Sequence, residues 1–206
     1  MSDDNLASST KTKSSMELDT LSDSFKPPMN MPPKIAALRK DRKYVWLTSD
    51  RAWGDRSAGD MIARAPIPKH FIHSKMYHPT KYEASHVFGH ISRKSLAGYV
   101  YFGSALCGTN GVIHSGCIAT IFDELLGLGM IFATGSGGVT LSLTVEHLRS
   151  FAADQVGLYF IDVESMEGRK VAVKGRLEDN DGVVYSEARG LYLTVKLPSK
   201  PAPSKL

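Results

Sequence analysis

An acidic pair interrupts an apolar, helix-like segment, and its position raises the question of what the carboxylates do. In residues 112–129, VIHSGCIATIFDELLGLG, Asp123 and Glu124 stand among hydrophobic side chains. At helical spacing Asp123 belongs to a lane of small residues, which reads Gly116, Thr120, Asp123 and Gly127. Residues on one lane share one face of a helix, so Asp123 projects along a stripe that another backbone or a ligand can approach closely.

The start of the same segment could supply hydrogen-bond donors to a developing negative charge. Ser115 is a residue type that often caps a helix, and we expect it to be the N-cap here. The first N–H groups of a helix have no partners within the helix, so they form an anion site. Such donors, with the carboxylate of Asp123 about two turns further along, provide an oxyanion hole and a base for attack of water on a carbonyl group.

The segments around this helix predict a sheet that covers it. Residues 97–108 are rich in β-branched and aromatic residues, as strands are, and the Gly-rich residues 134–138 end the helix. We therefore predict an α+β fold, in which a curved antiparallel sheet wraps around one long central helix. Four antiparallel strands follow the helix, and they cover residues 139–146, 156–166, 168–178 and 183–195, the last two flanking the hairpin turn Asn180-Asp181-Gly182.

The first strand after the helix has a regular pattern. Residues 139–146, VTLSLTVE, alternate between apolar and polar side chains. This period of two places Val139 and Leu141 on the apolar face and Thr140 on the polar face. The alternation slips by one residue at His147–Leu148, which predicts a β-bulge at that point.

Composition divides the chain into four parts. Residues 1–33, rich in Ser, Asp, Lys, Pro and Met, are predicted to be a disordered tail. Residues 34–94 are predicted to be an extension packed on the core, with a short amphipathic helix within 34–47 and short helices and loops after it. Residues 95–197 form the domain with the long helix and the sheet, and residues 198–206 form an exposed, Pro-rich tail.

The helix and the strands after it resemble a known family. His114-Ser115-Gly116, followed by Ala119-Thr120 and Asp123-Glu124, is similar to the motif HGGxxATxxDE of hotdog-fold acyl-CoA thioesterases of the PaaI type, and most of all to a fungal branch with an N-terminal extension. The resemblance covers about residues 97–195, roughly half of the chain. One departure is Ser115, which replaces a glycine of the motif. If the backbone at this position must adopt a conformation that only glycine takes readily, serine would disturb the oxyanion hole.

The resemblance implies roles for particular residues. Asp123 would be the catalytic carboxylate, and Thr140 would hold the attacking water. The oxyanion and substrate-binding positions of the motif fall on His114, Ser115, Gly116 and Glu124. The residues by themselves favour plainer roles for two of these: Glu124 as a solvated or ion-paired neighbour, and His114 as a side chain that holds the strand-to-helix turn.

The resemblance also implies partners. The substrate would be an acyl-CoA, with Arg169 and Lys170 near the CoA phosphates, although both could equally be solvated. The protein would be a homodimer or homotetramer with sheets joined edge to edge and no cofactor. The site would then lie between subunits, with Asp123 and Thr140 contributed by different chains.

Three functions remain open at this point. The first is hydrolysis of acyl-CoA to a free fatty acid and CoA, and the second is acyl-CoA binding without catalysis on the same fold. A hotdog hydratase is a third, less favoured reading, because such enzymes carry an Asp–His pair at another spacing. A serine hydrolase is unsupported because the chain has no G-x-S-x-G.

Cysteine and histidine are two further residue types that could carry chemistry. Cys117, in the first helical turn, could be a stabilised thiolate, but it is better read as a small buried hydrophobe. Five histidines have weak metal-like spacing without supporting ligands, so we predict no metal site; they are His70, His73, His78, His86 and His90.

Charge, cysteine content and a targeting signal limit the possible partners and location of the protein. A net charge of +4 is too weak and scattered to indicate nucleic-acid binding, and we expect no membrane span. Two cysteines indicate a reducing environment. The chain ends Ser204-Lys205-Leu206, the peroxisomal signal that an import receptor reads. We therefore predict a peroxisomal matrix protein, with the mitochondrion as the alternative, which the acidic N-terminus disfavours.

Overall fold

The computed structural model describes residues 31–47, 71–76, 78 and 80–195. These residues lie within one compact unit, Met31–Leu206. Our predictions for residues 1–30 of the N-terminal tail, for residues 48–70 and for the C-terminal tail with Ser204-Lys205-Leu206 fall outside the described residues, so they stay predictions.

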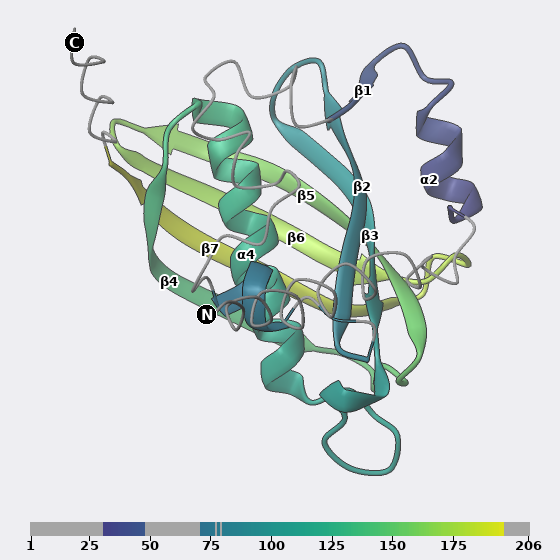
Figure 1. Cartoon of the computed structure of the whole chain (residues 1–206). Helices are drawn as coiled ribbons and strands as arrows, with labels where there is room; N and C mark the ends of the chain where they lie inside the picture. The colour runs from purple at the N-terminus through teal and green to yellow at the C-terminus, as the bar shows by residue number, and fades with distance from the viewer. Residues whose placement is uncertain (1–30, 48–70, 77, 79, 196–206) are drawn as a thin grey trace, which may run out of the picture. The chain divides into compact units, whose positions relative to one another are not determined.

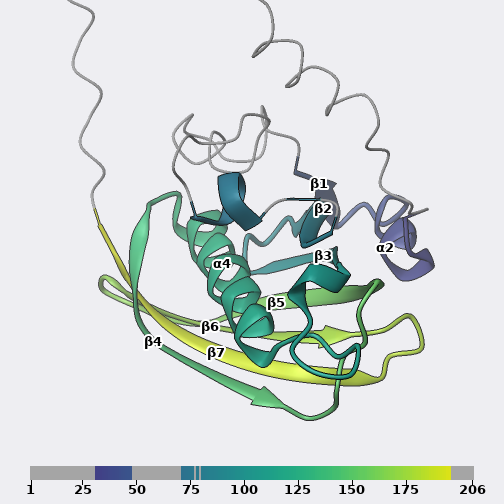
Figure 2. The same ribbon diagram turned by 60° about the horizontal axis from the view of Figure 1, so that its bottom comes forward.

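A seven-stranded antiparallel sheet curves around one long helix (Figures 1 and 2). The strand order is β1-β2-β3-β5-β6-β7-β4, and the helix α4 spans Ser115–Thr134. This arrangement confirms the predicted α+β fold: the strand expected before the helix and the four expected after it are present, and two further strands, β1 and β2, precede them. The strands are β1 Tyr44–Trp46, β2 Tyr82–His90, β3 Ser95–Phe102, β4 Gly138–His147, β5 Gln155–Glu167, β6 Lys170–Glu178 and β7 Val184–Thr194.

Part of the predicted extension joins the same sheet, which differs from the helices and loops that we expected there. β2 pairs with β3 along most of its length, and β1 pairs with β2 at the sheet edge. The register of β2 shifts between Ser85 and Phe88, so its apolar residues do not keep a period of two and the strand escapes a pattern search. The predicted helix within 34–47 is shorter than expected, α2 Pro33–Leu38.

The helix α4 forms the centre of the core. Its buried residues include Phe122, Leu126 and Met130, and the helix lies on the concave side of the sheet (Figure 2). The helix ends at Gly135, whose φ of 69° is the left-handed conformation that closes helices. From the β2–β3 turn, Arg93 donates to the carbonyl of Phe132 at 3.0 Å and supplies positive charge to the last turn.

The length and composition of α4 would also suit a membrane span, contrary to our expectation. The helix has 20 residues with a mean hydropathy of 1.6. However, 56% of its apolar window is buried inside the protein, as in a helix that forms a core. The sheet therefore supplies the apolar surroundings that this helix requires.

On the opposite face of the sheet, α2 is held by an ion pair. Ile35 of α2 is fully buried, and the helix contacts β3. Lys34 Nζ lies 2.9 Å from Glu178 Oε1, and Arg176 Nε lies 2.8 Å from Glu178 Oε2. Burial alone would raise the pKa of Glu178, but the hydrogen bonds from Arg176 and Lys34 outweigh it and hold the pKa below the ordinary value of 4.5.

The Glu178 cluster predicts a pH-dependent contribution to stability. A carboxyl group with a lowered pKa stabilises the folded state above its unfolded pKa, and this contribution is lost as the pH falls through the folded pKa. Glu178→Gln should therefore lower Tm at pH 7 by roughly 4–8 °C, from about 2 kcal/mol of charged hydrogen bonding. The difference from wild type should shrink as the pH falls below about 4.

Thermal unfolding followed by circular dichroism between pH 3 and pH 7 measures this effect. Glu167→Gln, which alters an exposed glutamate at the end of β5, is the matched control and should change Tm very little. A Tm difference between Glu178→Gln and wild type that stays constant over this pH range would contradict the assignment.

Candidate active site

The predicted carboxylate and the predicted hydroxyl meet in one chain. Thr140 Oγ1 donates to Asp123 Oδ1 at 2.9 Å, and this pair is exposed. Asp123 lies at the middle of α4, and Thr140 lies near the start of β4. The two residues therefore do not need two chains to come together, and our prediction that they act from different subunits is wrong.

A β-bulge turns Thr140 toward the helix. The register between β4 and β7 shifts between Thr140 and Ser142, which leaves Leu141 as the extra residue. Thr140 then faces the helix side of the sheet together with Leu143, three residues later, which strict alternation would forbid. At the predicted slip, His147–Leu148, β4 ends at His147, and the N–H groups of Leu148 and Arg149 both donate to the carbonyl of Tyr185, which is the two-to-one pairing of a β-bulge. The regular alternation of residues 139–146 therefore gave no sign of the bulge at Leu141, which brings Thr140 to Asp123.

The N-terminus of α4 differs from the prediction by one residue. His114 is the N-cap, and its Nδ1 accepts the N–H of Gly116 at 3.0 Å. The carbonyl of His114 accepts the N–H groups of Cys117 and Ile118. Among the hydrogen bonds of the described residues, none uses the N–H of Ser115. Ser115 is therefore the free donor at this helix end, and His114 holds the turn as expected.

Serine is compatible with the backbone at this position. Positive φ angles among non-glycine residues of the described chain occur at Arg93, Asn110 and Asp154, and Ser115 is not among them. Ser115 lies in the first turn of α4 with ordinary helical geometry. The replacement of the motif glycine therefore leaves the N–H donor in place.

A shallow cavity of about 280 Å³ opens beside Ser115. Its buried wall consists of Ile113, Ile118 and Phe151, and Leu148, which is 49% exposed, lies at its rim. Arg149 also lines the cavity, and its guanidinium donates to the carbonyl of Val184. The free donor thus stands next to an apolar surface that could accept part of a ligand.

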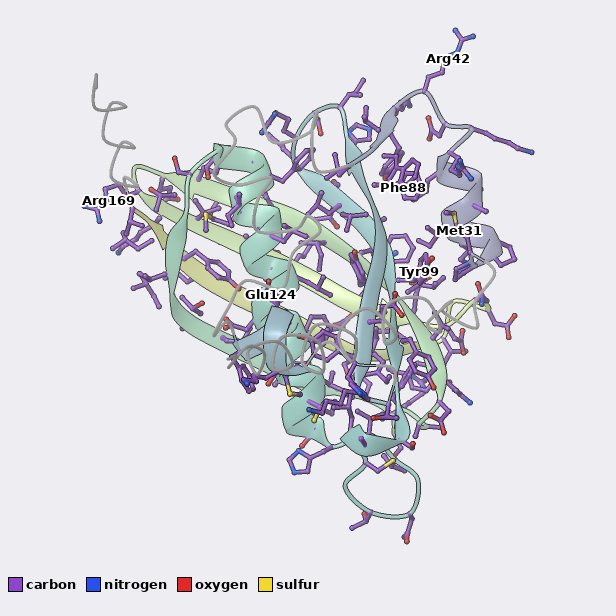
Figure 3. All side chains as sticks on the ribbon, viewed as in Figure 1. Met31, Arg42, Phe88, Tyr99, Glu124 and Arg169 are labelled. Atoms are coloured by element: carbon purple, nitrogen blue, oxygen red, sulfur yellow. The ribbon has the colours of Figure 1, made fainter. Side chains whose placement is uncertain are left out.

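Of the remaining predicted residues, Glu124 is next to Asp123 in α4, whereas Arg169 and Lys170 lie at the turn between β5 and β6. Glu124 is half-buried beside Asp123 at the middle of α4 (Figure 3). Arg169 donates to the carbonyl of Thr194 at 3.2 Å and projects from the β5–β6 turn, away from Glu124 (Figure 3). Lys170 is exposed at the start of β6. A role for Arg169 and Lys170 toward CoA phosphates stays a prediction.

Cys117 and the histidines add no chemistry to the described site. Cys117 packs against the core, and burial raises the pKa of its thiol, so a stabilised thiolate is disfavoured. Among the residues whose side chains the structure describes, no three His, Cys, Asp or Glu side chains come together as metal ligands do. The side chains of His70, His73 and His86 are outside this part of the chain.

One contact at the site was not predicted. Tyr192 of β7, 2% exposed, donates its hydroxyl to the main-chain carbonyl of Asp123 at 3.1 Å. Tyr192 is also the direct partner of Thr140 across the β4–β7 ladder. Gly190 and Tyr192 are two residues apart, so a strand places the glycine and the ring on one face. This spacing could have indicated a packed ring, but it does not indicate which group the hydroxyl binds.

The sequence and the fold of this domain are both similar to those of known thioesterases. Residues 110–185, which include α4 and most of the strands after it, match the thioesterase superfamily. A hypothetical thioesterase of Streptococcus pneumoniae, solved with coenzyme A, is similar in fold, with a TM-score of 0.50 and 17% sequence identity over 58% of this chain and 92% of that chain. The described domain therefore has the hotdog fold.

Curated relatives share this part of the chain. The acyl-coenzyme A thioesterase THEM4 of Xenopus laevis is 34% identical over 92 residues, which is 44% of this chain and 41% of the frog protein. A protein of Candida albicans, described as an uncharacterized mitochondrial protein, is 31% identical over 40% of this chain and 38% of its own length. The matched segments thus span less than half of each relative.

Proposed function

We propose that this protein hydrolyses acyl-CoA thioesters to a free acid and CoA. The observation that carries the proposal is the hydrogen bond of 2.9 Å between Thr140 Oγ1 and Asp123 Oδ1. It presents a carboxylate on an exposed stripe of small residues, within a domain that matches the thioesterase superfamily. The acyl-CoA thioesterase activity in the name of the frog relative supports the same substrate class.

The proposed reaction uses a base and an oxyanion donor. Thr140 orients Asp123, which takes a proton from water as the water oxygen forms a bond to the thioester carbon. The carbonyl oxygen becomes an oxyanion, which a backbone N–H stabilises. When the C–S bond breaks, the sulfur leaves with the electron pair and receives the proton from Asp123. Direct attack by the carboxylate, followed by hydrolysis of the resulting anhydride, would require the same residues.

The base and the donor of one chain lie far apart. Ser115 and Asp123 are eight residues apart on α4, so their backbones lie about 12 Å apart along the helix axis. The attacking water must lie about 3 Å from the carboxylate, and the carbonyl oxygen must lie about 3 Å from the N–H donor. We therefore propose that the N–H donor that serves one Asp123 comes from a second copy of the helix, from the residue that corresponds to Ser115.

The edge of the sheet is suited to such a second copy. β4 pairs with β7 on one side and is the edge strand of the sheet. Val139 is 50% exposed and Leu141 is 49% exposed on this edge. An exposed edge strand with apolar side chains favours pairing with another chain, and a two-fold axis there would relate the helices as well. We propose a homodimer as the minimum active unit.

Removal of the carboxylate should abolish most turnover. Asp123→Asn keeps the size of the side chain and the Thr140 contact but loses the base, so the release of CoA thiol should fall at least about a hundredfold. Thr140→Ala should cost less, about tenfold, because it removes an orienting hydroxyl. Thiol release is measured with a panel of acyl-CoAs from short to long chain, on the full-length protein.

The panel also separates catalysis from binding. Saturable acyl-CoA binding by wild type in calorimetry, without thiol release from any member of the panel, would favour the non-catalytic alternative. Near-normal turnover by Asp123→Asn would remove Asp123 from the mechanism and direct attention to Glu124.

The oxyanion donor can be deleted without disturbing the helix. Proline lacks an N–H and is favoured in the first turn, and His114 already has the extended ψ of 130° that a residue before proline requires. Ser115→Pro should therefore retain the fold but reduce kcat about a hundredfold or more. Ser115→Ala keeps the N–H and should stay within a few-fold of wild type.

Mixed dimers test whether the donor comes from the partner. When Ser115→Pro and Asp123→Asn subunits are mixed in equal amounts, each mixed dimer contains one site with an intact Asp123 and an intact Ser115 N–H. About a quarter of wild-type activity should return. Verified mixed dimers that remain inactive would show that base and donor act within one chain.

The location of the protein is also a proposal. The mitochondrial description of the Candida relative favours the alternative compartment, and nothing beyond Ser204-Lys205-Leu206 supports the peroxisome. A chain with a C-terminal fluorescent tag, which blocks any receptor that reads those residues, should still co-localise with a mitochondrial marker. Untagged protein that co-fractionates with peroxisomes, and moves to the cytosol when Leu206 is deleted, would reverse this assignment.

A further inference from the structure

A buried tyrosine beneath the proposed site holds the backbone of the catalytic residue. Tyr192 lies on the helix-facing side of β7 and is 2% exposed. Its hydroxyl donates to the main-chain carbonyl of Asp123 at 3.1 Å. In an α-helix this carbonyl also accepts the N–H of Gly127, and a carbonyl oxygen has two lone pairs for two such donors. The contact therefore adds to the helical hydrogen bond instead of replacing it.

Two glycines form the slot that holds the tyrosine ring. A Cβ atom on Gly190 would lie 2.6 Å from Cε2 and 3.0 Å from the hydroxyl oxygen of Tyr192, so a side chain at this position would displace the ring. A Cβ atom on Gly127 would lie 3.6 Å from Cε1 of the same ring. The ring thus lies over Gly190 and against α4 one turn beyond Asp123, which fixes the direction of the hydroxyl.

The two contacts to Asp123 come from neighbouring residues of the sheet. Thr140 binds the carboxylate and Tyr192 binds the main chain, and these two residues are direct partners in the β4–β7 ladder. Side chains of directly paired residues lie about 5 Å apart on the same face. Asp123 is therefore held at its main chain and at its carboxylate by a single rigid unit of the sheet.

The tyrosine hydroxyl remains a donor throughout the working pH range. Burial raises the pKa of Tyr192, and the negative charge of Asp123 raises it further. The hydroxyl is therefore protonated at neutral pH and can donate to the carbonyl of Asp123.

We propose that Tyr192 is a positioning residue, which holds Asp123 in register with Thr140 so that the carboxylate stays oriented toward the attacking water. This role rests on the proposed thioesterase function. A displacement of about 1 Å in a reacting group is enough to reduce a reaction rate severely. Asp123 lies in the middle of a 20-residue helix, and among the described hydrogen bonds only that of Tyr192 joins the sheet to its main chain.

Tyr192→Phe tests the role while keeping the ring. kcat for the best acyl-CoA should fall about tenfold with KM nearly unchanged, because orientation is lost and binding is not. In a Thr140→Ala background the same substitution should cost at most about twofold, because both changes impair one orienting unit. A merely structural role would instead add its effect to that of Thr140→Ala.

Tyr159→Phe is the matched control. Tyr159 is also fully buried on a strand, and its hydroxyl has no hydrogen-bond partner among the described residues. The control should keep wild-type kcat, without loss of thermal stability. Equal kcat values for Tyr192→Phe and Tyr159→Phe, or full additivity of Tyr192→Phe with Thr140→Ala, would overturn the proposal.

A second measurement separates this proposal from the proposed function. Amide hydrogen exchange of Gly127, whose N–H faces the Asp123 carbonyl, should accelerate several-fold in Tyr192→Phe and stay unchanged in Tyr159→Phe. If wild type releases no thiol from any acyl-CoA, the thioesterase function fails, and this exchange result alone decides whether the Tyr192 contact holds the helix. Unchanged exchange at Gly127 in Tyr192→Phe would reject the contact.

Discussion

The close packing of α4 against the concave side of the sheet is the constraint on which the rest of the structure depends. Gly129 lets the helix approach the sheet, since a Cβ atom there would lie only 2.7 Å from Cγ2 of Ile161. Interiors are packed as densely as crystals, so this short approach fixes the height of the helix above every strand. His114 caps the helix at one end, and Gly135 and Arg93 bind carbonyl groups at the other, whereas the N–H of Ser115 has no partner among the described residues.

When the apolar face of α4 is buried against the sheet, its stripe of small residues lies on the side of β4 and is partly exposed to solvent. Asp123 is on this stripe, and it remains exposed while its main chain is tied to Tyr192 and its carboxylate to Thr140. A charged group in an apolar helix is costly when it is buried without partners. Here the fold avoids that cost by exposing the carboxylate at the edge where a second chain is proposed to bind.

The segments before residue 95 extend the sheet and cover its outer face. β1 and β2 lengthen the sheet beyond β3, and α2 is anchored by Lys34 to Glu178. This side of the sheet is remote in the strand order from the exposed edge at β4. The two edges thus serve different purposes: one is occupied by the chain's own N-terminal residues, and the other leaves unpaired backbone groups for a partner.

The sequence by itself determined the elements whose patterns are local. The long apolar helix, the small-residue stripe with Asp123, and the four strands after it were all readable, because helical and strand periods are properties of consecutive side chains. The same holds for the family resemblance, which the match over residues 110–185 confirms. The strand β2 was not readable, because its register shift breaks the period of two.

Only the tertiary structure decided how these parts meet. The bulge at Leu141 has no signal in the faultless alternation of residues 139–146, because a register shift is set by the partner strand β7. The contact of Tyr192 with Asp123 joins residues 69 positions apart, and no local pattern encodes it. The capping of Gly116 by His114, which leaves the Ser115 N–H free, depends on the path of the chain into the helix. Distances across the sheet arise from packing, and packing is a property of the whole fold.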